Sequence, residues 1–155
     1  MKYSEEIQFF SKPFLIIIAV LVIAGLWLVM IGISNAGWVI IVAVLFPLLF
    51  GRLHITVKGN TLRVDFGYLG ILKKEILISD IRESRVVDYR PIVQFGGWGI
   101  RCGRFEGEPT GCYSLKGKRG LLLLLNRKMK ACIIKTDRIL IGCNEPEKLK
   151  ASIGK

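Results

Sequence analysis

The stretch FLIIIAVLVIAGLWLVMIGISNAGWVIIVAVLFPLLF, residues 14–50, contains no charged side chain. Charged residues recur every few positions after Gly51-Arg52, so the composition changes there. Ser34-Asn35 divides the stretch into one apolar run over residues 14–33 and another over 37–53. A helix of about 20 residues rises about 30 Å, the thickness of a bilayer core. The sequence therefore predicts two transmembrane helices joined by a tight turn.

Two other interpretations of this apolar block stay open. It is also compatible with a buried helical pair in a soluble protein, but the remaining part of a 155-residue chain is too short to enclose such a pair. Ser34-x-Ala36 resembles a signal-peptide cleavage site. The apolar run is longer than a normal signal-peptide core, however, and a second apolar run follows it at once.

Basic residues predict the orientation of the hairpin. Of the 23 Lys and Arg residues, only Lys2 and Lys12 precede the apolar block, and Glu5 and Glu6 balance their charge. The net charge of +11 therefore belongs to the part of the chain after Gly51. Because basic flanks face the cytoplasm, we expect a multi-pass protein of the cytoplasmic membrane with both termini inside.

The four cysteines do not form a metal-binding pattern. Cys102, Cys112, Cys132 and Cys143 include no C-x-x-C pair, and His54 is the only histidine. This spacing is poor for zinc, and no metal or cofactor is expected. Free thiols fit a cytoplasmic domain, whereas two disulfides remain possible if the domain is extracellular.

The chain after the hairpin has the hydrophobic period of β-strands. Apolar residues alternate with polar ones on both sides of a Gly59-Asn60 turn, which predicts a β-hairpin with one buried face. Further short strands follow, with an apolar strand over residues 121–125 that turns back at Asn126-Arg127-Lys128. Seven short strands with such turns predict an antiparallel sandwich or barrel.

The C-terminal residues predict one short helix. Asn144 is a candidate N-cap, with Glu147 three residues later and Pro146 in the first turn. Leu149 and Ile153 are four residues apart, so both can face the sheet. This helix is expected to cover one mouth of the barrel.

The run Gly96-Gly97-Trp98-Gly99-Ile100-Arg101 resembles a motif of bacterial and archaeal pleckstrin-homology-like (PH-like) proteins, many of which carry a preceding pair of transmembrane helices. Residues 62–67, 78–81 and 136–147 are also similar, so the resemblance covers nearly all of residues 1–153. It implies an α+β protein with a membrane anchor over residues 1–53 and a mostly antiparallel PH-like barrel with a C-terminal capping helix over 54–155. Most of these proteins have no assigned activity. Phosphoinositide specificity is not implied, because the basic first-hairpin signature of phosphoinositide-binding eukaryotic PH domains has no counterpart here.

The glycines of this motif have a functional and a structural interpretation. A phosphate-binding loop is disfavoured because the run lacks G-x-G-x-x-G spacing and precedes a strand pattern. We expect instead that Gly96, Gly97 and Gly99 allow a bulge or a tight crossing where Trp98 enters the core.

Two predicted loops concentrate positive charge. They contain the candidate lipid- or anion-binding residues Lys116, Lys118, Arg119, Arg127, Lys128 and Lys130. Each basic side chain near an anionic leaflet contributes on the order of 1 kcal/mol to binding. A solvated basic surface is an equally good interpretation. Tethering at the membrane argues against nucleic acid as the partner.

No residue set indicates catalysis. His54 is alone, Glu106 and Glu108 lie in a loop pattern, and no nucleophile has a recognisable base. We therefore predict a non-enzymatic binding or scaffolding module that engages a protein partner at the cytoplasmic face of the membrane. Anionic lipid headgroups are the alternative ligand. A further alternative is a small subunit of a membrane complex, with Gly25 and Gly32 as small packing residues.

Overall fold

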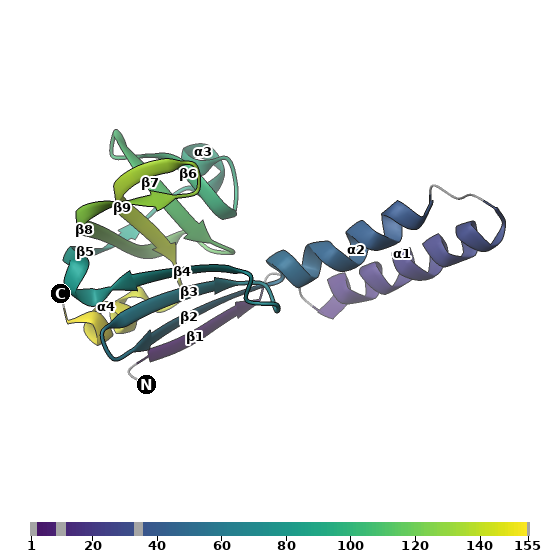
Figure 1. The fold of residues 1–155 in the computed structure, drawn as a ribbon, viewed down its shortest axis with the longest axis horizontal. Helices are drawn as coiled ribbons and strands as arrows, with labels where there is room; N and C mark the ends of the chain where they lie inside the picture. The colour runs from purple at the N-terminus through teal and green to yellow at the C-terminus, as the bar shows by residue number, and fades with distance from the viewer. Residues whose placement is uncertain (1–2, 9–11, 33–35, 155) are drawn as a thin grey trace.

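A computed structural model describes residues 3–8, 12–32 and 36–154 (Figure 1). The fold is α+β, with two mostly antiparallel sheets, a helical hairpin that projects away from them and a short C-terminal helix. The α+β class is confirmed. The described residues form nine strands in two sheets, which agrees with the sandwich alternative and not with one barrel of seven strands.

The first sheet is an antiparallel meander. Its strands, in spatial order, are β1 (Tyr3–Gln8), β2 (Arg52–Lys58), β3 (Thr61–Phe66) and β4 (Leu72–Leu77). Leu53, Ile55 and Val57 are fully buried, while the residues between them on β2 are partly exposed. The alternation predicted for this part of the chain is therefore confirmed, with one face of the sheet toward the core.

In the sequence, the helical hairpin lies between two strands, β1 and β2, that are paired neighbours in this sheet. It consists of α1 (Lys12–Met30) and α2 (Ala36–Phe50), which run side by side (Figure 1). The sequence predicts no strand before the hairpin, but β1 lies there and pairs with β2 along its whole length. The turn predicted at Ser34-Asn35 lies outside the described residues.

The predicted transmembrane hairpin is wrong: no helix within the described ranges is long and apolar enough to cross a membrane. α1 ends at Met30, and the apolar part of it, residues 14–30, rises about 25 Å. α2 has 15 residues, including Pro47, and rises about 22 Å. A bilayer core is about 30 Å thick. The multi-pass location in the cytoplasmic membrane, with both termini inside, was inferred from the two spans and loses its basis with them.

The second sheet has five strands. Their spatial order is β5 (Ile81–Asp88), β8 (Arg119–Ala131), β9 (Ile134–Gly142), β7 (Glu108–Ser114) and β6 (Gly99–Phe105). β7 and β9 are parallel, and the other neighbours are antiparallel. A 3-10 turn, η1 (Ile78–Asp80), leads from the first sheet into β5.

β8 is longer than the sequence predicts. The expected turn at Asn126-Arg127-Lys128 is wrong, because the strand continues to Ala131 and the chain reverses after it. The register with β9 shifts between Leu124 and Met129, which indicates a bulge that accommodates the polar residues within the strand. Pairing with β9 resumes at Met129, opposite Thr136.

The apolar strand segment at residues 121–125 explains how two cores form. Leu121, Leu123 and Leu125 belong to the main core between the sheets, whereas Leu122 belongs to a second cluster on the other face of the same sheet. That second cluster also contains Tyr89, Phe95, Phe105, Cys112 and Leu140. Phe95 comes from α3 (Pro91–Phe95), a short helix that the sequence analysis does not predict.

The predicted C-terminal helix is present as α4 (Pro146–Ile153), and its Leu149 and Ile153 are buried. The predicted capping box is wrong. Glu145 is the N-cap residue and makes no side-chain capping hydrogen bond. The backbone N–H of Asn144 instead donates to Glu5 Oε1 at 2.7 Å, which connects the start of α4 to β1.

Candidate binding site at the base of the hairpin

The glycine-rich motif forms the turn between α3 and β6. Gly96 ends α3 with a φ of 71°, and Gly97 and Gly99 have φ values of 127° and 108°. L-residues rarely adopt such values, so the backbone path itself requires glycine at these positions. Trp98 does not enter the core as predicted: its side chain is 39% exposed, because residue 98 lies in this turn before the strand begins.

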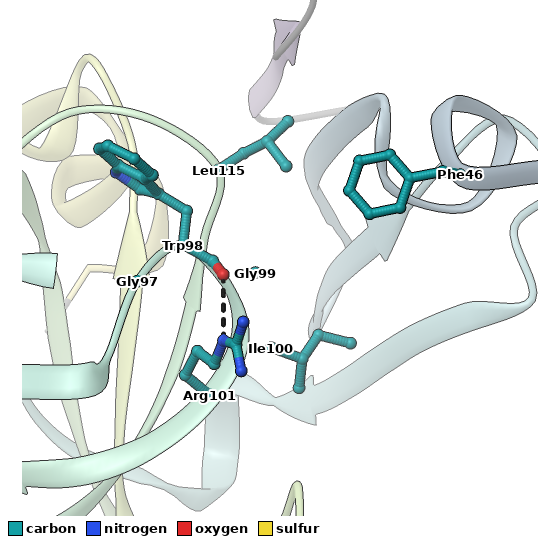
Figure 2. Close-up of a pocket in the computed structure, with 7 residues that line it drawn as sticks. All are labelled: Phe46, Gly97, Trp98, Gly99, Ile100, Arg101 and Leu115. Atoms are coloured by element: carbon teal, nitrogen blue, oxygen red, sulfur yellow. Dashed lines mark hydrogen bonds between the residues drawn. The ribbon is translucent and has the colours of Figure 1, made fainter. Parts of the chain in front are cut away.

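The motif lines a cavity together with two segments that are distant in sequence. The cavity has a volume of about 460 Å³ and is lined by Phe46, Gly97, Trp98, Gly99, Ile100, Arg101 and Leu115. Figure 2 shows the side chains of Phe46, Ile100 and Leu115 turned toward the same gap. Phe46 comes from α2, so the base of the hairpin forms one wall of this hairpin-base cavity.

Arg101 supplies the only charge in this lining. Its Nε–H donates to the backbone oxygen of Trp98 at 3.2 Å (Figure 2), which fixes the guanidinium beside the turn. Within the described ranges, Arg101 forms no ion pair with a carboxylate. The cavity therefore combines apolar walls with one cation that is not neutralised by an acidic neighbour.

Backbone contacts attach the base of the hairpin to the first sheet. The N–H of Tyr68 donates to the carbonyl of Leu48 at 2.8 Å, and the N–H of Gly67 donates to the carbonyl of Arg52 at 2.7 Å. A Cβ on Gly67 would overlap the backbone of Leu48 and Leu49. The Arg52 guanidinium carbon also lies 5.2 Å from the centre of the Tyr68 ring. The β3–β4 turn thus determines where α2 leaves the sheet.

The rest of the hairpin exposes an apolar surface. Along α1, the large side chains of Ile16, Val20, Ile23, Trp27 and Met30 are each 58–86% exposed. Their spacing is 4, 3, 4 and 3 residues, so they lie along one stripe of the helix. On α2, Trp38, Val42 and Leu45 repeat the spacing of 4 and 3 and are also exposed. We refer to these eight residues as the exposed stripe.

No family model matches the chain, and no similar protein was found among curated proteins or solved structures. The resemblance to PH-like proteins therefore stays a prediction.

The six predicted basic residues do not form one site. Lys116 and Lys118 precede β8, and Arg119 is its first residue. Arg127 and Lys128 lie within the bulge of the same strand, and Lys130 lies beyond it. At about 3.3 Å per residue, Arg119 and Arg127 are roughly 25 Å apart along the strand. Both arginines form ion pairs, Arg119 with Glu147 and Asp88, and Arg127 with Asp80. The anionic-lipid interpretation stays a prediction without a single binding site to support it.

His54 lies on the outer face of the first sheet, beside Ser4, a neighbour that the sequence did not predict. Its Nε2 is 3.0 Å from Ser4 Oγ of β1, and its Nδ1 is 3.4 Å from Thr56 Oγ1. Among the described residues, no carboxylate hydrogen-bonds to this imidazole. The contact with Ser4 was not predicted because β1 itself was not recognised.

The other chemically active groups take structural roles. Glu106 accepts hydrogen bonds from Arg85 at 3.3 Å and Arg138 at 2.8 Å. All four cysteines are free thiols, and Cys102 Sγ donates to the carbonyl of Ala131 at 2.9 Å. Burial raises the pKa of the Cys112 thiol to about 12, which keeps it protonated at neutral pH. The described part of the chain contains no group of three or more potential metal ligands.

Proposed function

We propose that this chain is a non-enzymatic binding and scaffolding module whose protein partner is a second copy of the same chain. The docking element is the α1–α2 hairpin, which joins the hairpin of the partner copy in a four-helix bundle. The observation that carries the proposal is the exposed stripe, Ile16, Val20, Ile23, Trp27 and Met30 on α1 with Trp38, Val42 and Leu45 on α2.

The spacing of the exposed stripe favours helices as the partner surface. Alternating steps of 4 and 3 residues place side chains as in the seam of a helical bundle, where each side chain inserts between those of a facing helix. A stripe of this kind on both helices of a hairpin can pair with the same stripe on another copy through a two-fold axis. The result is a bundle with short connections and antiparallel neighbours.

Charge argues for a second copy as the occupant. Residues 14–50 carry no charged side chain, so a charged partner surface would lose its hydration without gaining an ion pair. The charged residues of this chain, with a net charge of +11, lie outside residues 14–50. The hairpin of another copy is the matching uncharged surface that the chain itself supplies.

The exposed area is large enough for a stable dimer. A buried aromatic side chain covers about 150–250 Å², so Trp27 and Trp38 alone expose roughly 200–300 Å². With the other six residues of the exposed stripe, the surface approaches the roughly 800 Å² per partner of a standard interface. Isolated monomers rarely leave so large a contiguous apolar patch in water.

Sedimentation velocity of the full chain and two charged variants tests this proposal. We expect the wild type to sediment as a dimer, and Ile23→Glu and Val42→Glu to sediment as monomers. The matched control is Ile133→Glu, because Ile133 is 89% exposed but lies in the β8–β9 turn, and it is expected to stay dimeric. A monomeric wild type would contradict the proposal, as would flotation of the wild type with lipid vesicles in place of self-association.

A further inference from the structure

We infer that the hairpin-base cavity binds an amphipathic anion, a molecule with one acyl chain that ends in a carboxylate or a phosphate. The proposal goes beyond the self-association of the hairpin, because the cavity lies where α2 meets the second sheet and does not use the exposed stripe. Its parts are the apolar wall, the single cation and the open glycine turn.

The apolar wall comes from three separate segments. Phe46 on α2, Ile100 on β6 and Leu115 after β7 face the gap from different sides (Figure 2). The volume of about 460 Å³ lies within the range of roughly 300–1,000 Å³ that is typical of small-molecule sites. Such walls favour a flexible hydrocarbon chain, since they offer side-chain surface without side-chain acceptors or donors.

Arg101 provides recognition for an anionic end group. Its Nε–H is occupied by the carbonyl of Trp98, which leaves the guanidinium held in one place at the edge of the apolar wall. A guanidinium matches carboxylate and phosphate oxygens with two parallel hydrogen bonds. Because Arg101 has no ion-pair partner among the described residues, an incoming anion does not have to displace one.

The glycine turn leaves room for the ligand. A Cβ built on Gly97 or Gly99 would meet nothing within 4 Å, so the space beside both residues is open. The positive φ values already exclude most side chains there. The same backbone path that requires glycine therefore keeps one side of the cavity unobstructed, next to Arg101.

Fluorescence of Trp98 in the full chain tests the proposal at the cavity itself. The sequence has three tryptophans, so Trp27→Phe with Trp38→Phe leaves Trp98 as the single emitter and removes signals from the hairpin surface. The probes are dodecanoate, dodecyl phosphate and 1-dodecanol below their aggregation concentrations, with acetate and inorganic phosphate as anions without a chain. Circular dichroism of each variant checks the fold.

We expect dodecanoate and dodecyl phosphate to cause a saturable blue shift of the Trp98 emission. 1-Dodecanol should bind about tenfold more weakly because it lacks the charge. Arg101→Gln should weaken binding of both anions about tenfold and leave 1-dodecanol unchanged. Arg104→Gln removes the same charge from β6 outside the cavity and should change nothing. Ile100→Phe should weaken all three by filling the cavity.

The relative affinities of the two anions identify the source of the ligand: tighter binding of dodecanoate indicates a free fatty acid, and tighter binding of dodecyl phosphate indicates a phosphorylated lipid. Equal affinity for dodecanoate and 1-dodecanol, or equal response to acetate, would overturn the proposal. Sedimentation velocity of the wild type separates the two proposals. A dimeric wild type that does not bind the anions would contradict the cavity proposal alone, and a monomeric wild type that binds them would contradict self-association alone.

Discussion

Ile7 of β1 lies opposite Leu53 of β2 in an antiparallel register, although the whole α1–α2 hairpin lies between them in the chain. Both ends of the hairpin are therefore attached to adjacent strands of one sheet. This pairing, together with the contacts of Leu48 and Arg52 with the β3–β4 turn, holds the base of the hairpin. The hairpin is thus an insertion in the β domain and not an N-terminal appendage.

Ile7→Ala tests whether β1 belongs to the core. Ile7 is 3% exposed, so truncation should lower the free energy of unfolding by about 2–5 kcal/mol. Gln8→Ala changes the exposed neighbour on the same strand and should have an effect within about 0.5 kcal/mol. Urea denaturation measures both. Equal, small effects would mean that β1 does not pack on the sheet.

Gly67→Ala tests the attachment of α2. Gly67 and Gly70 both have positive φ, 74° and 62°, so alanine should cost roughly 1–2 kcal/mol at either position. At Gly67 the new Cβ also overlaps the backbone of Leu48 and Leu49, whereas at Gly70 it meets nothing within 4 Å. Thermal denaturation should therefore show a clearly larger loss for Gly67→Ala. Equal losses at the two glycines would argue against the close approach of α2.

The carboxyl group of Glu147 makes the stability of the fold depend on pH in the acidic range. A backbone hydrogen bond at the start of α4, and then the Arg119 guanidinium, lower the pKa of this carboxyl below its ordinary value. A pKa lowered by folding stabilises the protein above the unfolded pKa, and the contribution is lost as the pH falls through the folded pKa. Glu147→Gln should therefore reduce the loss of stability between about pH 5 and pH 3.

Arg119→Gln should also reduce the loss of stability at acid pH, but by a smaller amount than Glu147→Gln, because the backbone hydrogen bond to the Glu147 carboxylate remains. Urea denaturation at a series of pH values measures both variants. A pH profile that is the same for wild type and Glu147→Gln would contradict this assignment.

The sequence correctly predicted those parts of the fold that depend on residues close to one another in the chain. The alternation around Gly59-Asn60 correctly predicted the β2–β3 hairpin, and the spacing of Leu149 and Ile153 predicted α4. The turn expected at residues 126–128 failed because these residues form a bulge within β8, and pairing with β9 resumes beyond them at Met129. β1 was missed because it is six residues long and its partner lies beyond the hairpin.

The candidate site was predicted only in part. Three glycines within residues 96–99 indicated an irregular backbone there, and this segment is the turn that lines the cavity. Nothing in the sequence indicated that Phe46 and Leu115 would join this turn, because those contacts depend on the tertiary fold. The transmembrane prediction assumed that the first helix extends over the whole apolar run, residues 14–33. The helix ends at Met30, inside that run, and its apolar part is shorter than assumed.

The most direct test of the self-association of the hairpin is oxidative cross-linking between copies of the full chain through single added cysteines. Ile23→Cys and Val42→Cys place the thiol on the exposed stripe, and Ile133→Cys places it on an equally exposed position elsewhere, with the wild type as the baseline for the four native thiols. We predict a covalent dimer for Val42→Cys and Ile23→Cys at protein concentrations where Ile133→Cys gives none above the baseline. Dimer formation that is absent at both stripe positions, or equal at all three positions, would contradict it.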